Sequence, residues 1–445
     1  MTTSAPSTAS AVDTADAVRH RAHALPHPAP VDASRWPDVA RAPRLSRTRA
    51  AIARLIVRRA FARLPLRVQW GDGPVTGSAG PVLRIRDPHA FFRRIGADGL
   101  IGFGESRMAG EWDADDLVGV LTVLAAHVTD LVPAPLQRLR GRWAQRQPGT
   151  ERNTLQGARE NIHRHYDLSN DLFALFLDAT MTYSSAIFRN LPANRDDLAG
   201  AQRRKIDRLL DLADVGPDTR LLEIGTGWGE LALRAAARGA RVVTVTLSRE
   251  QRDLAVRRIA EAGHADRVSV RLCDYREVDG SYDAVVSVEM IEAVGEEYWP
   301  VYFRHLHRLL APGGRIALQA ITIAHDRMLA TRGDYTWIHK YVFPGGIIPS
   351  VRAIEQVAAD TGLRIARADA YAEHYAETLR LWRERFTSRA GHLAELGFDE
   401  TFRRMWEFYL AYCEAGFRAR YLDVHQLLLT GAGMPVALTE DGGAR

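Results

Sequence analysis

The chain contains few cysteines and no long hydrophobic run. Its two cysteines, Cys273 and Cys413, lie far apart among 445 residues. This scarcity excludes a disulfide scaffold and a cysteine-based zinc site, and it is typical of a reducing compartment. Because no run of about eighteen apolar residues occurs, no segment is predicted to span a membrane.

Signals for secretion, metal binding and nucleic-acid binding are missing as well. The N-terminus lacks the basic start and apolar core of a secretory signal, so we expect the chain to remain in the cytoplasm. No HExxH-like spacing occurs among its 15 histidines, and we therefore expect no metal. The arginines are not interleaved with aromatic residues, which argues against nucleic acid as a partner.

The length and composition indicate two domains and a sizeable core. With 445 residues, 46% of them hydrophobic, the chain is long enough for both. Residues 1–43 are rich in Ala, Ser, Thr and Pro, which predicts a disordered leader. A small α+β domain is expected at 44–150, with short strands in 66–85 and two helices around a glycine loop in 87–117. The larger domain is expected at 151–435.

The start of the small domain is strongly basic. Residues 44–64 carry seven arginines and no acidic residue. One face of the helix predicted here holds Ile56, Val57, Ala60, Phe61 and Leu64. Such a helix suits an anionic lipid surface, which would make the protein peripheral on the inner face of the cell membrane. The alternative is a helix packed on its own domain with a solvated arginine face.

From residue 200 onward, apolar strands alternate with amphipathic helices. The expected strands are TRLLEIG, RVVTVTL, VSVRLCD, YDAVVSVEM and GRIALQAIT. This alternation predicts an α/β fold with a doubly wound, mostly parallel sheet. Ligands bind such sheets beyond the carboxyl ends of the strands.

The turn LLEIGTGWGE places Gly225, Gly227 and Gly229 between a strand and a helix. Glycines allow a tight turn and let a ligand approach the backbone closely. The spacing is E-x-G-x-G-x-G and not the dinucleotide pattern G-x-G-x-x-G. Glu223, just before the first glycine, suits a cationic amino-acid group and would repel a pyrophosphate. The turn therefore favours S-adenosylmethionine over a nicotinamide cofactor.

The next two strands end in residues that suit the rest of this cofactor. Thr246, Leu247 and Gln251 follow the second strand and are expected to hold a ribose through hydroxyl, backbone and amide groups. Asp274 and Tyr275 follow the third strand, where Asp274 is placed to accept from an adenine amine.

These turns, together with HRHYDLSNDLFALFLDATMTYSSAIF, GLIGFGESRMAGEWDADDL, WIHKYVFPGGIIPS and YCEAGFRARYLDVHQLLL, closely resemble the cyclopropane-fatty-acyl-phospholipid synthase family. The resemblance runs from about residue 81 to residue 430 and leaves out the leader and the basic helix. It implies a Rossmann-like class I methyltransferase that uses S-adenosylmethionine. It also implies methyl addition to a cis double bond of a phospholipid acyl chain, followed by proton loss from the resulting carbocation.

Members of that family resemble one another in holding a bicarbonate base with a Cys backbone, a Glu, a His and a Tyr. By this resemblance the glutamate falls on Glu292 and the tyrosine on Tyr375. The cysteine is replaced by Ser185 and the histidine by Gln319, which weakens the case for bicarbonate in this chain.

Further family positions surround these. Tyr183 and Ser184 match residues that close over the methionine part of the cofactor. Trp337, Tyr341 and Phe343 either wall an apolar acyl channel or belong to an ordinary core. The mouth of the site, or plain packing, is expected for His165 and Tyr166.

Glu289 lies three residues before Glu292, where the family commonly has glycine. At the carboxyl end of a strand, both side chains can face the pocket. We hypothesise that the Glu289 carboxylate replaces bicarbonate as negative charge and base. The alternative is that it only binds backbone groups or the amino end of the ligand. Two close carboxylates would share a proton, which predicts one raised and one lowered pKa.

Two products fit this chemistry. Proton loss from the inserted methyl group closes a cyclopropane, whereas a hydride shift before that loss leaves a methylene branch (10-methylene). The leader, Ser185 and the turn EMIEAVG favour the branched product of some actinobacterial relatives. Whether the chain forms a homo-oligomer or works with a partner reductase stays open. Rival functions are methyl transfer to a soluble amine and a catalytically inactive lipid-surface binding protein.

Overall fold

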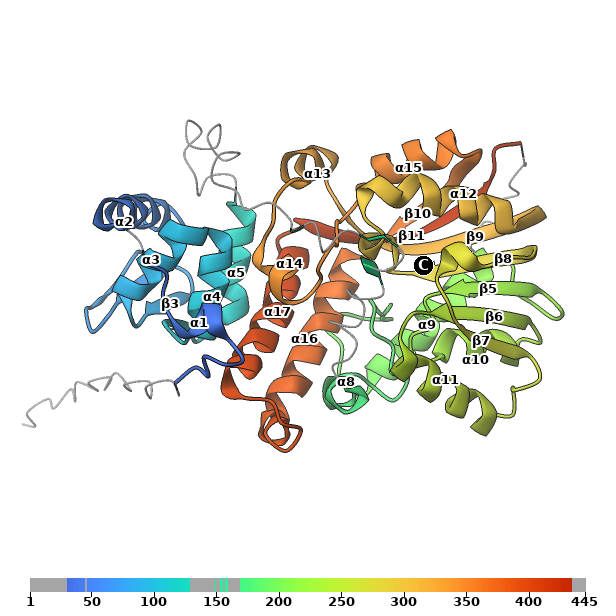
Figure 1. Cartoon of the computed structure of the whole chain (residues 1–445), viewed down its shortest axis with the longest axis horizontal. Helices are drawn as coiled ribbons and strands as arrows, with labels where there is room; N and C mark the ends of the chain where they lie inside the picture. Colours follow the sequence, from blue (N-terminus) through green and yellow to red (C-terminus); the bar gives the residue numbers. More distant parts are fainter. Residues whose placement is uncertain are drawn as a thin grey trace, which may run out of the picture.

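The computed structural model describes residues 30–44, 46–128, 148, 153–154, 157–158 and 169–433. Two sheets lie toward opposite ends of an elongated molecule, and the helix pair α16 (Ala372–Ser388) and α17 (Glu400–Arg418) lies between them (Figure 1). No helix in this part of the chain is long and apolar enough to cross a bilayer.

The larger sheet has seven strands in the order β10-β11-β9-β8-β5-β6-β7. Strands β7, β6, β5, β8 and β9 are parallel, and β11 runs antiparallel to both of its neighbours. The predicted doubly wound, mostly parallel sheet is thus confirmed. Its first five strands along the sequence, β5 to β9, match the five predicted strands. The strands are β5 (Arg220–Ile224), β6 (Arg241–Thr246), β7 (Val268–Leu272), β8 (Tyr282–Val288), β9 (Leu310–Ile323), β10 (Leu363–Ala370) and β11 (Leu422–Gly431).

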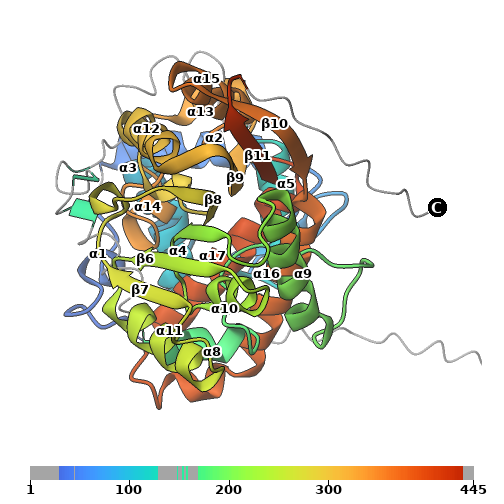
Figure 2. The same cartoon turned by 90° about the vertical axis from the view of Figure 1, so that its right-hand side faces the viewer.

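Helices cover both faces of this sheet (Figures 1 and 2). One face carries α12 (Trp299–Leu309) and α15 (Val351–Asp360), and the other carries α9 (Asp197–Leu212), α10 (Glu230–Ala237) and α11 (Arg249–Glu261). Helix α12 buries Trp299, Tyr302, Phe303, Leu306 and Leu309, which repeat at the spacing of one helical face. The apolar stripe, more than helix propensity, therefore holds it on the strands.

The smaller sheet has the order β2-β1-β3-β4. Its strands are β1 (Arg67–Trp70), β2 (Val75–Thr76), β3 (Val82–Ile85) and β4 (Trp112–Ala114). The two predicted helices around a glycine are also present, because Gly99, with φ 55°, separates α3 (Pro88–Asp98) from α4 (Leu100–Met108). Further helices of the described residues are α5 (Leu117–Ala126), α8 (Asn170–Phe176), α13 (His325–Thr331) and α14 (Trp337–Tyr341), with short 3-10 turns at Tyr275–Glu277, Ile291–Ala293, Glu296–Tyr298 and Ala390–Leu393.

The smaller sheet and the helices around it, α3 to α5, form a small unit that shares its hydrophobic core with α16 and α17. Helix α17 contacts both α4 and α5. Trp112 on β4 packs edge to face on Phe408 of α17, with ring centroids 6.0 Å apart, and Trp337 of α14 meets the same ring at 4.7 Å. Trp337 is 4% exposed and belongs to this core, as one of its two interpretations expected. The expected domain boundary between 150 and 151 lies outside the described residues.

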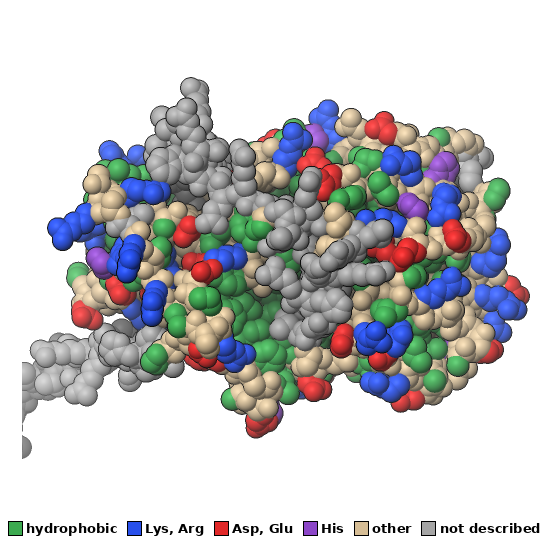
Figure 3. All heavy atoms as spheres, in the orientation of Figure 1, with side chains coloured by type: hydrophobic (Ala, Val, Ile, Leu, Met, Phe, Trp, Pro, Cys, Tyr) green, Lys and Arg blue, Asp and Glu red, His purple; other side chains and the backbone are tan. Residues whose placement is uncertain are grey.

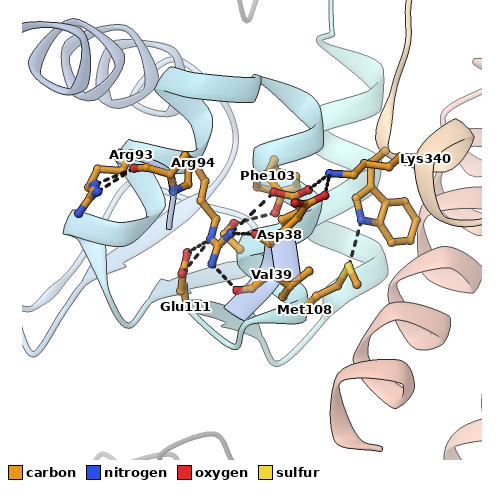
Figure 4. A network of polar contacts seen from close by, with 12 residues as sticks. Asp38, Val39, Arg93, Arg94, Phe103, Met108, Glu111 and Lys340 are labelled. Atoms are coloured by element: carbon orange, nitrogen blue, oxygen red, sulfur yellow. Dashed lines mark hydrogen bonds and ion pairs between the residues drawn. The ribbon is translucent and has the colours of Figure 1, made fainter. Parts of the chain in front are cut away.

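The predicted leader extends too far toward the small domain. Residues 30–43 pack against the folded chain: Val39, in α1 (Pro37–Ala40), is 1% exposed, and the Trp36 indole donates to Asp399 at 2.8 Å. Arg94 of α3 donates to the carbonyl oxygens of Asp38 and Val39 (Figure 4). Composition alone hid this, because a few anchoring side chains suffice to order a segment rich in alanine and proline.

The basic helix forms as α2 (Arg47–Phe61), capped by Ser46. Its predicted apolar stripe faces inward, with Phe61 and Leu64 buried and Val57 packed against the same core. The opposite face exposes Leu55 to 63% and Ile52 to 52%. The stripe therefore packs on its own domain, and a different pair of apolar side chains meets solvent.

Candidate active site

A cavity opens at the carboxyl ends of β5, β6 and β8, where the sheet topology predicts a ligand. The glycine turn after β5 forms its floor, with Gly225 at φ 96° and Gly227 at φ 51°. A Cβ on Gly225 would lie 2.8 Å from Met290 Cγ, whereas one on Gly227 would meet nothing within 4 Å. Gly229 does not line the cavity; it lets α10 approach Ala255, where a Cβ would lie 3.1 Å from that residue's Cβ.

Glu223, at the end of β5, lines this cavity although it is 3% exposed. Its Oε2 is buried without a hydrogen-bond partner among the described residues. Burial raises the pKa of this carboxyl to about 8, against the opposing effects of Thr244 and Lys205. An unsatisfied buried acceptor is costly, so the site is built for a donor that arrives with the ligand.

Of the predicted residues after β6 and β7, all but one line the cavity. Thr246, Leu247 and Gln251 line the cavity, and the Thr246 hydroxyl donates to Gln251 Oε1 at 3.0 Å. Tyr275 also lines it, with a hydroxyl that is buried and unpartnered among the described residues. Asp274 does not line the cavity, and Arg276 donates to both of its oxygens at 2.7 and 2.8 Å, so its bond to an adenine amine stays a prediction.

Tyr183 and Ser184 close the cavity from the side of the segment before α9. The hydroxyls of Tyr183 and Tyr409 lie 2.6 Å apart. Ser184 Oγ accepts a hydrogen bond from Lys205 Nζ at 2.5 Å. Lys205 was not predicted as a site residue, although its place on the apolar face of α9 was a signal, since a lysine there must point into the protein.

Three of the predicted catalytic residues bind a fourth, Glu289. Its Oε1 accepts from Ser185 N at 2.9 Å and from Gln319 Nε2 at 2.7 Å, and its Oε2 accepts from the Tyr375 hydroxyl at 2.6 Å. Gln426 Nε2 donates to Gln319 Oε1 at 3.0 Å, which orients the Gln319 amide toward Glu289. We call Ser185 N, Gln319 Nε2 and the Tyr375 hydroxyl the carboxylate cage.

The backbone of Glu289 is as unusual as its contacts. Directly after β8, the residue takes φ 51°, in the left-handed region that non-glycine residues seldom adopt. Its N–H donates to Gln319 O at 2.7 Å, which anchors the turn to β9. Strained backbone of this kind persists where the surroundings enforce it, and here it aims a carboxylate into the cavity.

Glu292 takes a different position. Its Oε1 accepts from Ile321 N on β9, its Oε2 is buried without a described partner, and the side chain does not line the cavity. The structure shows no hydrogen bond between Glu292 and Glu289 in the described part of the chain. Burial raises the pKa of Glu292 to about 8 and also raises that of Glu289. The predicted pair with one lowered pKa is therefore wrong, because burial disfavours the charged form of both carboxylates and the charge of Glu289 raises the pKa of Glu292 further.

The remaining predictions do not bear on this cavity. Tyr341 donates to Glu105 at 2.8 Å, and Phe343 packs on Tyr409. His165 and Tyr166 lie outside the described residues.

Comparison with known proteins agrees with this geometry. Residues 153–427 match the family model for mycolic acid cyclopropane synthetase. Over 417 residues the chain is 57% identical to the tuberculostearic acid methyltransferase UfaA1 of Mycobacterium tuberculosis, which covers 92% of this chain and 98% of that protein. It is 33% identical to the cyclopropane-fatty-acyl-phospholipid synthase of Escherichia coli, over 80% of this chain and 89% of that protein.

Solved structures show the same relationship. The cyclopropane synthase MmaA2 of Mycobacterium tuberculosis superposes with a TM-score of 0.56 at 32% identity, covering 61% of this chain and 97% of that one. Mycolic acid cyclopropane synthase CmaA1, complexed with SAH and CTAB, gives a TM-score of 0.56 at 31% identity, covering 64% of this chain and 98% of that one. The chain therefore belongs to the mycolic acid cyclopropane synthetase family and is a methyltransferase whose cofactor is S-adenosylmethionine.

Proposed function

We propose that the protein adds a methyl-derived carbon to the cis double bond of an unsaturated phospholipid acyl chain and leaves a methylene branch. The observation that carries this is the Glu289 carboxylate, held by three donors at 2.6 to 2.9 Å on the wall of the cofactor cavity. Alkene alkylation produces a cation and releases a proton, so it needs fixed negative charge and a base together. The identity of 57% to a tuberculostearic acid methyltransferase supports the same substrate class.

Glu289 and the residues that bind it have different roles in the proposed reaction. The bound cofactor supplies an electrophilic methyl group. As the new carbon–carbon bond forms, positive charge develops on the acyl chain, and the Glu289 carboxylate stabilises it without bonding to it. Glu289 then accepts the proton. Tyr375, Gln319 and the Ser185 N–H hold its two oxygens, so little reorganisation is needed during the reaction.

Glu289 takes the place that the family resemblance gives to bicarbonate. The donors expected around that anion, namely the backbone at Ser185, the amide of Gln319 and the hydroxyl of Tyr375, all bind this side chain. Burial raises the pKa of Glu289, while the Lys205 charge and the cage lower it. A base whose pKa approaches the working pH is the efficient one.

The choice between products depends on which carbon loses the proton. We infer the methylene branch, after a hydride shift, because the relative with 57% identity is a tuberculostearic acid methyltransferase. Converting that branch to a methyl group adds two electrons and two protons, which is the work of a separate reductase. Proton spectra and masses of lipids from cells that express the protein test this. We expect exocyclic alkene signals; upfield cyclopropane signals without them would contradict the proposal.

An inactive lipid-binding protein and a soluble amine as substrate are the rivals. A preserved base and an unsatisfied acceptor in the cofactor cavity disfavour the first, since neither is needed for surface binding. S-adenosylhomocysteine release with unsaturated phospholipid vesicles, compared with saturated ones and with soluble amines, separates all three. We expect release with unsaturated vesicles only.

We propose that the outer face of α2 docks the protein on anionic lipid. Leu55 and Ile52 are 63% and 52% exposed. The exposed arginines of the same helix and its end are Arg47, Arg49, Arg54, Arg58, Arg59 and Arg63. Basic side chains gather at the end of the molecule that carries α2 (Figure 3). Each basic residue near an anionic membrane contributes about 1 kcal/mol, and the two apolar side chains can enter the interface.

The variant Ile52→Ser/Arg59→Gln should therefore bind phosphatidylglycerol vesicles about tenfold more weakly in sedimentation, because it loses one charge and one apolar anchor. Val256→Ser/Arg257→Gln is the matched control, since Val256 is 46% exposed on α11 in the other unit. The control should bind like wild type, and neither variant should bind phosphatidylcholine strongly. Equal sedimentation of both variants would contradict docking through α2.

A further inference from the structure

A buried lysine lies in the wall of the cofactor cavity. Lys205, on α9, is 1% exposed and lines the cavity. The stripe that turns it inward also carries Ile206 and Leu209, which are 1% and 0% exposed. The packing of α9 on the sheet therefore directs the lysine side chain into the protein, where it lines the cavity.

The ammonium group is incompletely satisfied. Of its three donors, one reaches Ser184 Oγ at 2.5 Å. Lys205 forms no ion pair within 4.0 Å to any carboxylate of the described residues. The carboxylates of Glu289, Asp178 and Glu223 act on it from farther away, and burial lowers its pKa to about 8. Since a buried charge is costly without a close partner, the position calls for an anion in the cavity.

A buried acceptor without a partner faces the same cavity. Glu223 Oε2 has no hydrogen-bond partner among the described residues. One cavity thus presents an ammonium group with unused hydrogen-bond donors and a carboxylate oxygen that can still accept hydrogen bonds. The complementary ligand group is a zwitterion, with its carboxylate at the lysine and its ammonium at the glutamate. The methionine end of S-adenosylmethionine is such a group.

We propose that Lys205 is a cofactor-binding residue that pairs with the α-carboxylate of the methionine part of S-adenosylmethionine, while Glu223 takes the amino group. The hydrogen bond to Ser184 Oγ holds the lysine in position. This inference rests on the cofactor and not on the acyl chemistry proposed above. Lys205 could otherwise serve only to hold the charge of Glu289, and that is the competing role that the experiment must separate.

The test uses two ligands that differ in one group. S-adenosylhomocysteine carries both the amino group and the carboxylate, whereas its decarboxylated analogue keeps the amine alone. Calorimetric titration of the full chain needs no acyl substrate, so its result is independent of the reaction. Lys205→Met should weaken S-adenosylhomocysteine about 10- to 100-fold and leave the decarboxylated analogue within about twofold, because hydrogen bonds to charged groups are the strong ones.

Glu223→Gln is the reciprocal control, and it should weaken both ligands because both carry the amine. Wild type supplies a measurement that does not depend on whether Lys205→Met folds: it should bind S-adenosylhomocysteine at least about tenfold more tightly than the decarboxylated analogue. Equal wild-type affinities would overturn the proposal. So would equal weakening of both ligands by Lys205→Met. Unchanged S-adenosylhomocysteine binding with a shifted pH profile of turnover would also overturn it and assign the lysine to Glu289.

Discussion

Glu289→Gln should lower turnover with unsaturated phospholipid about 10³-fold, within the range of about 10² to 10⁴ for loss of a general base. The amide fills the same space in the carboxylate cage but carries no charge and accepts no proton. S-adenosylhomocysteine affinity should change little, since the cofactor's polar ends have other predicted partners. Initial rates of S-adenosylhomocysteine release and a cofactor titration measure the two effects. Full turnover with cofactor still bound would eliminate Glu289 as the base.

A second variant distinguishes a base from a structural carboxylate. Glu289→Gly empties the carboxylate cage while leaving its three donors, and the φ of 51° at this position suits glycine. Added bicarbonate or formate should therefore restore part of the lost turnover, whereas wild type should not respond. Glu292→Gln is the matched control, because that carboxylate binds Ile321 N outside the cage and its loss leaves no anion site there. Absence of any rescue in Glu289→Gly would count against replacement of a bound anion.

Much of the site could be predicted because parallel strands bring their carboxyl ends together. The turn after β5 and the glutamate after β8 lie far apart in the sequence but follow adjacent strands. Their residue types and their places after these strands were therefore enough to predict that they meet at one cavity. The prediction that Ser185, Gln319 and Tyr375 lie together rested on family resemblance, since no local sequence pattern relates three segments so far apart. The structure adds that all three bind Glu289 and not Glu292.

The sequence could not indicate the local contacts that some of these side chains make. The place of Asp274 after a strand predicts a ligand contact, but it does not reveal that Arg276, two residues on, donates to both of its oxygens. The direction of Glu292 is set by the 3-10 turn Ile291–Ala293, which sequence pattern does not resolve. Strand β10 was missed because it is an edge strand whose residues are mostly half-exposed, so it shows no continuous apolar run.

Arg94 joins residues 30–43 to the small unit, and its replacement should have a large effect on stability. Arg94 is 1% exposed; its Nε donates to Glu111 at 2.9 Å, and its two terminal nitrogens donate to the carbonyls of Asp38 and Val39 at 3.0 and 2.6 Å (Figure 4). Lys340 of α14 binds Glu105 at 2.6 Å and Asp38 at 2.8 Å, so the network extends to α14. Residues 30–43 are therefore held by buried charge as well as by Val39.

Arg94→Met should lower the free energy of unfolding by about 3 to 5 kcal/mol, because it leaves Glu111 and two carbonyls without their buried donor. Denaturant unfolding measures the loss. Arg93→Met is the matched control: the neighbouring arginine is half-buried and, within the described residues, donates only to Pro43 O, at 3.0 and 2.7 Å, so its loss should cost about 1 kcal/mol. Equal losses in the two variants would show that burial of the Arg94 charge is not the source of the stability.

The pH dependence gives an independent check of the Arg94 network. Burial raises the pKa of Glu111 from 4.5 to about 7, while Arg94 opposes that shift. Removing Arg94 raises the pKa of Glu111 further, so the folded variant keeps a proton that the unfolded chain releases above pH 4.5. Because the folded state then binds more protons, the variant's stability falls as pH rises through that window. Wild type holds the same proton up to about pH 7, so the two proteins lose stability together below that pH and only the variant continues to lose it above. The deficit of Arg94→Met relative to wild type should therefore be larger at pH 8 than at pH 5, and a deficit independent of pH would mean that Glu111 is not the group left without a partner.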